Sequence, residues 1–289
     1  MSIITFTSKA GREFKLDLPD TGDAQHVFVL SAAKCGSSLL TLLLMDYLRA
    51  ENIPFYNPFD RVFQQGVLFK DLPDEVYTEI NARPGIYLGF RALYNLGKSP
   101  RFQTARKVAL VRDPRDALVS HYFSVQKSHS LPADGPAREA MLKAREAAGG
   151  AEINNFIQNE RVGDFIVKAL RGISRLNPAD TVFYRYEDVI FKKGPWLRHM
   201  LGQMGVADIN VEFAQSVADK HDIVPDDEDP SRHVRQVTPG NFRRHLSEET
   251  IRQIESEYMD VFIRFGYTPE CEPLANPDNL SAIPLARVD

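Results

Sequence analysis

A chain of 289 residues with 43% hydrophobic and 26% charged side chains has the composition of a soluble globular protein, and its length fits one large α/β domain that needs no disulfides or metal to hold its core. The net charge of −4 excludes a general nucleic-acid binder, because long-range attraction to a polyanion requires surplus basic residues. The two cysteines, Cys35 and Cys271, imply no disulfide framework, and no apolar run is long enough for a signal sequence or a membrane span, so we expect a cytoplasmic protein.

The first clear secondary-structure signal follows an N-terminal extension of residues 1–25. The weak alternation in that extension is compatible with an edge strand or with a segment that simply covers the domain. Residues 26–30 predict a buried strand, and a loop of small residues then leads into a predicted helix over residues 36–50. The first N–H groups of a helix lack intrahelical partners and carry partial positive charge, so this junction can bind a phosphate or sulfate oxygen.

The loop at this junction reads Lys34-Cys35-Gly36-Ser37-Ser38. Gly36 lets the backbone approach an anion closely, Ser37 and Ser38 add hydroxyl donors, and Lys34 adds a full charge. The lysine precedes the glycine, whereas in the common Gly-x4-Gly-Lys-Ser/Thr nucleotide loop it follows the last glycine. The alternative is that the loop is only a turn between a strand and a helix.

Strands and helices alternate along the rest of the chain. Strands are predicted at residues 53–56, 85–93, 107–111 and 181–184, and helices at residues 72–81, 114–127, 139–148, 152–171, 195–204, 211–219 and 247–265. This alternation predicts a single α/β domain over residues 26–267, with a mainly parallel central sheet flanked by helices, and an irregular tail over residues 268–289. Ligands of such sheets collect at the carboxyl ends of the strands, so Lys34 and Arg112 should reach one crevice.

The most specific segment covers residues 107–123 and reads Lys-Val-Ala-Leu-Val-Arg-Asp-Pro-Arg-Asp-Ala-Leu-Val-Ser-His-Tyr-Phe. Arg112 ends the predicted strand, where its guanidinium can bind a phosphate through two N–H groups. Asp116 and Ser120 share one face of the following helix, so Ser120 can point back at the same anion. The alternative is that the charged residues at positions 112–116 only cap the helix and form ion pairs.

Together these two segments resemble the nucleotide-binding motifs of the sulfotransferases that use 3′-phosphoadenosine 5′-phosphosulfate (PAPS). The resemblance implies the P-loop-NTPase-like sulfotransferase fold. It implies that Lys34 and the N–H groups of residues 35–38 hold the 5′-phosphosulfate. It also implies that Arg112 and Ser120, eight residues later, hold the 3′-phosphate.

Two further segments resemble the family less closely. Tyr186 begins a Tyr-Glu-Asp segment, which in the family places the tyrosine near the adenine; a buried core tyrosine is the alternative. Arg235-Gln-Val-Thr-Pro-Gly-Asn-Phe-Arg looks like a degraded version of the segment that closes over the 3′-phosphate, so Arg235 is a candidate ligand. Residues 222–229 are acidic and residues 232–245 basic. We expect a lid there that orders around the nucleotide, with a solvated charged loop as the alternative.

The sequence departs from the family at two further places. Leu39 stands where small-molecule sulfotransferases have a tryptophan against the adenine. Their general base is a histidine on the third strand, but residues 88–92 read Leu-Gly-Phe-Arg-Ala and contain none. Asp60, beside a run of aromatic residues, is the candidate base instead, with an Asx-type turn cap as its alternative role. The aromatic run is compatible with a substrate wall or with a flap over the core.

The resemblance implies transfer of a sulfuryl group from PAPS to a hydroxyl or amine of a small-molecule or glycan acceptor, which releases 3′,5′-ADP (PAP). The protein would position the reactants and stabilise charge on the leaving oxygen. No metal is expected, since the histidines show no ligand spacing, and nothing predicts the oligomeric state. Two other classes stay open: a P-loop kinase, which would need a Walker-type lysine and a magnesium carboxylate, and a catalytically silent nucleotide-binding protein of the same fold.

Overall fold

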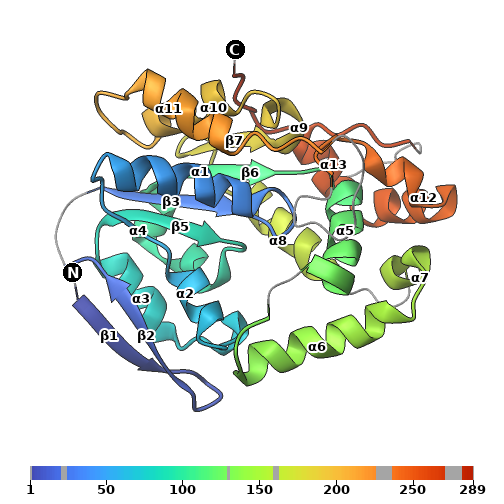
Figure 1. Ribbon diagram of the computed structural model, residues 1–289, viewed down its shortest axis with the longest axis horizontal. Coiled ribbons are helices and arrows are strands. Elements are labelled where there is room, and N and C mark those ends of the chain that lie inside the picture. Colours follow the sequence, from blue (N-terminus) through green and yellow to red (C-terminus); the bar gives the residue numbers. More distant parts are fainter. Residues whose placement is uncertain are drawn as a thin grey trace.

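The protein is built around one parallel sheet (Figure 1). The computed structural model describes residues 2–20, 25–128, 131–158, 163–225, 236–270 and 282–288. The sheet has the strand order β4-β5-β3-β6-β7, and each neighbouring pair is parallel. The strands are β3 (His26–Ser31), β4 (Phe55–Tyr56), β5 (Gly85–Phe90), β6 (Arg106–Val111) and β7 (Thr181–Arg185). The predicted α/β class with a mainly parallel sheet is confirmed.

Helices cover both faces of this sheet (Figure 1). On one face lie α1 (Ser37–Ala50), α10 (Lys193–Gln203) and α11 (Val211–Lys220). On the other lie α2 (Pro58–Gln64), α3 (Asp74–Ala82), α4 (Pro100–Thr104), α5 (Pro114–Phe123), α8 (Asp164–Ser174), α12 (Glu248–Glu257) and α13 (Met259–Phe265). Three further helices are α6 (Gly135–Gly149), α7 (Ile153–Gln158) and α9 (Tyr186–Val189).

The central strand β3 is buried from end to end. Val27 and Val29 pack into the core beneath α1, whereas Phe28 and Leu30 pack into the core on the opposite face. A strand covered on both faces needs apolar side chains at successive positions, which explains the continuous apolar run in the sequence.

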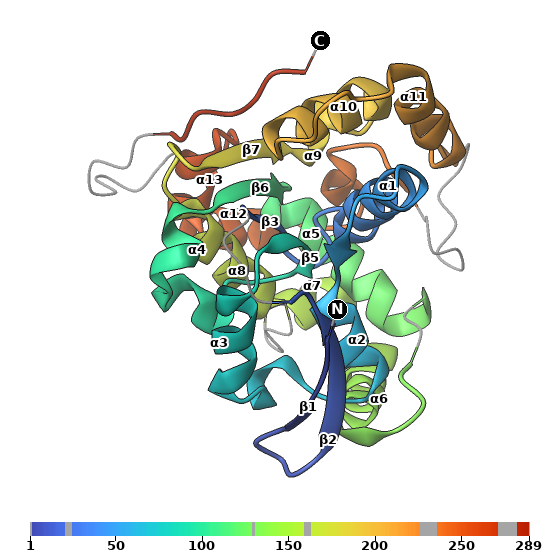
Figure 2. The ribbon, with the colours of Figure 1, turned by 90° about the vertical axis from the view of Figure 1, so that its left-hand side faces the viewer.

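The N-terminal residues form a separate hairpin of β1 (Ser2–Thr7) and β2 (Glu13–Leu18), paired antiparallel. Figure 2 shows this hairpin beside α2 and away from the main sheet. Phe14, Leu16 and Leu18 are buried in the core on the α2 face. The N-terminal segment therefore covers the domain and adds no edge strand to the central sheet.

Two predicted helices are divided. The prediction of one helix over residues 247–265 was wrong, because α12 ends and α13 begins around Tyr258, whose φ of −118° and ψ of 22° depart from the helical range. Within residues 152–171 the structure describes α7 and α8, and residues 159–162 lie outside the described ranges. Helix α5 continues into a π-helical turn, Ser124–Ser128.

Part of the C-terminal segment extends the sheet. Leu285 forms a parallel bridge with Phe183 of β7, and the Ala286 N–H donates to the Phe183 carbonyl at 2.8 Å. Residues 282–288 thus satisfy backbone groups at the β7 edge without forming a full strand. Within the described ranges, no helix combines the length and the apolar character required to cross a bilayer.

Candidate active site

The carboxyl ends of β3 and β6 bring the two predicted anion-binding segments together. These strands are neighbours in the sheet, and each chain continues from its strand into a loop and a helix. The Nη1 group of Arg112 donates to the carbonyl oxygen of Lys34 at 3.2 Å. Lys34 and Arg112 therefore lie at one edge of the sheet and not on different sides of the molecule.

The loop after β3 has an unusual backbone. Lys34 has a φ of 66° and Gly36 a φ of 88°, both in the left-handed region. A β-carbon at position 36 would lie 2.9 Å from Cδ2 of Tyr186, so both conformation and space require glycine there. A non-glycine residue in this region stores strain, and such strain is concentrated at functional sites. The loop therefore places two left-handed residues directly before α1.

Not every predicted donor of the loop is available. The Cys35 N–H donates to the Ala32 carbonyl at 3.1 Å, so it closes a turn instead of pointing to a ligand. Burial raises the pKa of the Cys35 thiol to about 12, which keeps the thiol neutral. Ser37 is buried and Ser38 exposed, and the amides in this first helical turn have no intrahelical acceptor. Leu39 is half-buried and packs against the core beneath α1.

The Lys34 side chain reaches across to α5. Its Nζ donates to Ser124 Oγ at 2.8 Å, at the point where α5 passes into the π-helical turn. Ser120 and Ser124 are four residues apart, so they share one face of that helix. Ser120 is half-buried. The lysine and both serines thus line the same side of the site; sequence reasoning missed Ser124.

Arg112 is buried against Tyr186. Its guanidinium carbon lies 4.4 Å from the centroid of the tyrosine ring, which is a cation–π contact. Nη2 lies 3.9 Å from Oδ2 of Asp116, and the Nε–H has no hydrogen-bond partner among the described residues. Tyr186 is itself buried and donates to the carbonyl of Val237 at 3.3 Å. A buried cation with a donor to spare is suited to an anionic ligand.

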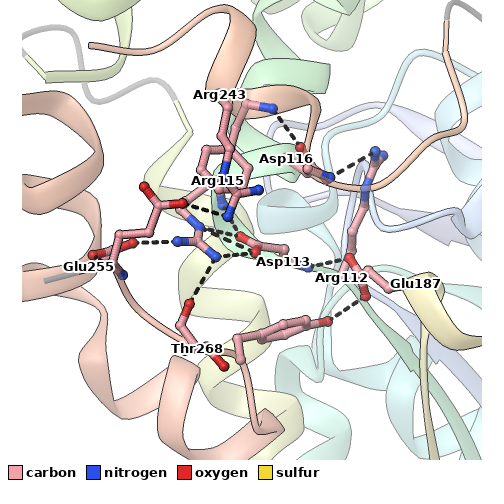
Figure 3. A network of polar contacts seen from close by, with 12 residues as sticks. Arg112, Asp113, Arg115, Asp116, Glu187, Arg243, Glu255 and Thr268 are labelled. Atoms are coloured by element: carbon pink, nitrogen blue, oxygen red, sulfur yellow. Dashed lines mark hydrogen bonds and ion pairs between the residues drawn. The ribbon is translucent and has the colours of Figure 1, made fainter. Parts of the chain in front are cut away.

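Asp116 fixes part of the predicted lid. Its Oδ2 accepts from the Gly240 N–H at 2.7 Å and its Oδ1 from the Phe242 N–H at 2.9 Å, as Figure 3 shows around Asp116. Burial raises the pKa of Asp116. Residues 236–245 therefore lie against the start of α5, whereas Arg235 and the rest of residues 226–235 lie outside the described residues.

Asp113 and Arg115 belong to a separate buried network (Figure 3). The Asp113 carboxylate caps α5 by accepting from the Arg115 N–H at 2.9 Å, and it pairs with the Arg115 guanidinium at 2.6 Å. Arg115 also pairs with Glu255 and donates to the carbonyl of Thr268 at 3.3 Å. Each interpretation of residues 112–116 therefore applies to different residues. Asp113 and Arg115 form the helix cap and ion pairs, whereas Arg112 faces the site.

Glu187 supports this network from the end of β7. Its Oε1 accepts from the Asp113 N–H at 2.9 Å, and its Oε2 from the Tyr267 hydroxyl at 3.0 Å. Burial raises the pKa of Glu187 to about 7, with hydrogen bonds and the charge of Arg112 acting in the opposite direction. Glu187 therefore changes its protonation state near neutral pH while it accepts a hydrogen bond at the start of α5.

Asp60 lies on the other side of the loop, in the first turn of α2. The helix cap is Asn57, whose Oδ1 accepts from the Asp60 N–H at 3.4 Å and whose Nδ2 donates to Asp60 Oδ2 at 2.7 Å. Arg91, which follows β5, has Nη2 at 3.6 Å from Asp60 Oδ1 and donates from Nη1 to Ser37 Oγ at 2.6 Å. Asp60 is thus connected to the loop through Arg91. Sequence reasoning missed Arg91, although its position at a strand tip was a usable signal.

The aromatic run around Asp60 is divided between core and surface. Phe59 is buried and packs on Phe90, with ring centroids 4.6 Å apart, and on Tyr94 at 5.1 Å. Phe63 and Phe69 are half-buried. Phe59 is therefore part of the core, and only its neighbours can face a ligand. No group of three or more His, Cys, Asp or Glu side chains within the described ranges is placed to hold a metal ion.

Comparisons with known proteins point to one family. The family model described as "Sulfotransferase domain" matches residues 24–266. A mouse sulfotransferase complexed with PAP has the same fold, with a TM-score of 0.52 at 16% identity over 83% of this chain and 86% of that chain. Retinol dehydratase in complex with androsterone and inactive cofactor PAP gives a TM-score of 0.44 at 14% identity over 91% of this chain and 89% of that chain. No curated protein matches the chain significantly.

Proposed function

Because the chain belongs to the sulfotransferase domain family, we propose that it transfers the sulfuryl group of PAPS to a hydroxyl or amine of a small-molecule or glycan acceptor and releases PAP. One observation carries the proposal: the loop of Lys34 and the side chain of Arg112 meet at one edge of the sheet, joined by a hydrogen bond of 3.2 Å. A single nucleotide with phosphates at both ends can then bridge the two segments.

At the 5′ end, Lys34 and the amides of the first turn of α1 bind the phosphosulfate. The contact with Ser124 fixes the direction of the lysine Nζ, which neutralises the oxygen that bridges sulfur and phosphorus as that bond breaks. Charge develops on this oxygen in the transition state, so a preorganised cation there accelerates the reaction more than it tightens binding.

At the 3′ end, Arg112 and Ser120 bind the phosphate, and Tyr186 lies beside the adenine. The Nε–H, which has no partner in the described part of the chain, and the stacking on Tyr186 favour this role for Arg112, because the ring holds the guanidinium plane in place. Arg235 remains a proposed ligand that lies outside the described residues.

Asp60 is the proposed general base. The acceptor oxygen or nitrogen forms a bond to sulfur while the bond between sulfur and the 5′-phosphate oxygen breaks, and the acceptor proton passes to the Asp60 carboxylate. Its position beside the loop supports this role, since Arg91 contacts both Asp60 and Ser37.

A thermal-shift comparison with a turnover assay tests the function. We expect PAP without magnesium to raise the melting temperature, ATP with magnesium to leave it unchanged, and radiolabelled PAPS to be consumed when alcohols, phenols, amines and glycans are screened as acceptors. Stabilisation by ATP with magnesium alone would point to a kinase. PAP binding without turnover of any acceptor would point to a silent nucleotide-binding protein.

A further inference from the structure

A third cation lies at the tip of a third neighbouring strand. The order β5-β3-β6 places Arg91, Lys34 and Arg112 at one edge of the sheet, with Lys34 in the middle. Arg91 is therefore on the side of the loop opposite Arg112, toward α2 and Asp60. A guanidinium has only hydrogen-bond donors and stays protonated, so Arg91 cannot act as the general base that removes a proton from the substrate.

The contact between Arg91 and Ser37 determines where the serine proton points. A serine hydroxyl has one donor and two acceptor sites, and Arg91 Nη1 occupies one acceptor site at 2.6 Å. Since the guanidinium cannot accept, the hydroxyl proton must point elsewhere, and the structure shows no acceptor for it among the described residues. Ser37 is buried in the first turn of α1, beside the amides that face an anion. The charge of Arg91 thus strengthens a donor directed into the loop.

The second contact of Arg91 holds Asp60. Nη2 lies 3.6 Å from Oδ1 of Asp60, while Asn57 occupies Oδ2 at 2.7 Å. Asn57 fits there because β5 has Gly89 beside it, with a φ of 84°; a β-carbon would lie 2.2 Å from Asn57 Oδ1. The carboxylate is therefore oriented from two sides by residues that come from two elements.

We propose that Arg91 is a positioning residue that serves both reactants, directing the Ser37 hydroxyl at the 5′-phosphosulfate and orienting the Asp60 carboxylate toward the acceptor. This inference rests on the proposed function. The two side chains have separate tasks: Asp60 takes the proton of the acceptor, and Arg91 holds the Asp60 carboxylate beside the loop of residues 34–38.

A double-mutant cycle on PAP affinity tests the nucleotide contact. We expect Arg91→Gln and Ser37→Ala each to weaken PAP binding about tenfold, and the double variant to lose about tenfold rather than about a hundredfold, because both remove the same interaction. Arg61→Gln is the matched control: it removes the same charge one residue from Asp60, but Arg61 pairs with Asp17 of the hairpin. Its PAP affinity should be unchanged. Additive losses would overturn the contact.

The second cycle uses turnover at saturating PAPS. We expect Arg91→Gln to lower kcat about tenfold with the acceptor KM unchanged, Asp60→Asn to lower kcat further, and the double variant to match Asp60→Asn. Arg91→Lys should recover part of kcat, and melting temperatures establish that each variant folds. A double variant slower than Asp60→Asn would overturn the coupling. Wild-type protein that neither binds PAP nor consumes PAPS would instead refute the proposed function, and this inference with it.

Discussion

The two flanks of the loop at residues 34–38 are built differently. On the Arg112 side, ionic groups are buried and interlocked: Arg115 and Glu255 have 4% and 0% of their side-chain surfaces exposed. On the Arg91 side, the pair of Arg91 and Asp60 is 29% and 38% exposed and separated by 3.6 Å. Buried pairs are costly to break, whereas exposed pairs contribute little stability. We infer that the first flank holds the fold together and that the second is free to serve chemistry.

The largest expected effect is the loss of stability that follows when an ion pair of the buried flank is removed. Arg115→Met should lower the free energy of unfolding by about 3–5 kcal/mol, because it leaves Asp113 and Glu255 buried without their cation. Denaturant unfolding measures the loss. Arg252→Met, which removes an exposed arginine paired with Glu248, is the control and should change the stability by less than about 1 kcal/mol. Equal losses in the two variants would contradict the assignment of the lost stability to burial of the ion pair.

The pH dependence of stability tests the buried flank in a second way. Glu187 has a pKa raised by burial to about 7, so the folded state binds its proton more tightly than the unfolded chain. Its contribution is therefore fully favourable below about pH 4.5 and is lost as pH rises through about 7, by up to about 3 kcal/mol. Glu187→Gln should flatten unfolding curves measured between pH 5 and pH 8. A variant with the wild-type slope would assign the pH dependence to other groups.

Between the flanks, Lys34 should affect rate and not stability. We expect Lys34→Ala to lower turnover about a hundredfold or more, the scale of a lost oxyanion donor, while the melting temperature changes little because the side chain is only half-buried. Steady-state kinetics with labelled PAPS measures the effect. Lys70→Ala, which removes an exposed lysine, is the control. Near-normal turnover in Lys34→Ala would exclude the proposed role.

The smallest effect on stability is expected on the exposed flank. Asp60→Asn should change the free energy of unfolding by less than about 1 kcal/mol, because its ion pair with Arg91 is long and solvated. The same variant should lose most of its turnover if Asp60 is the base. Chemical denaturation and kinetics on one preparation separate the two results, and a large loss of stability would make Asp60 a structural residue.

Local patterns were enough to predict the strands and helices that carry Lys34 and Arg112. The strands before Lys34 and Arg112 contain runs of apolar residues that indicate buried strands. The alternation of strands and helices along the chain predicts a parallel sheet, although it does not determine which strands are neighbours. The parallel sheet itself is confirmed, whereas the ligands of Lys34, Arg112, Ser120 and Tyr186 stay predictions. The position of the N-terminal hairpin could not be predicted from the sequence, because an alternation of apolar and polar residues does not show which surface of the domain the segment covers.

Contacts between distant segments could not be predicted. Arg91 and Ser37 are 54 residues apart, and Arg115 and Glu255 are 140 apart, so no periodicity in the sequence connects them. The break between α12 and α13 at Tyr258 also could not be predicted. The residues around it keep a helical apolar pattern, while the chain turns to pack Phe262 and Phe265 in the core. Tertiary packing overrides local propensity at such points.

The narrow gap between residue 36 and the Tyr186 ring sets a limit on redesign of this enzyme. One added methyl group would displace the ring against which Arg112 is stacked, so an alteration at the proposed phosphosulfate site would be transmitted to the proposed 3′-phosphate site. Variant libraries aimed at new acceptors should therefore keep this glycine fixed and diversify the half-exposed positions around α2, such as Phe63 and Phe69.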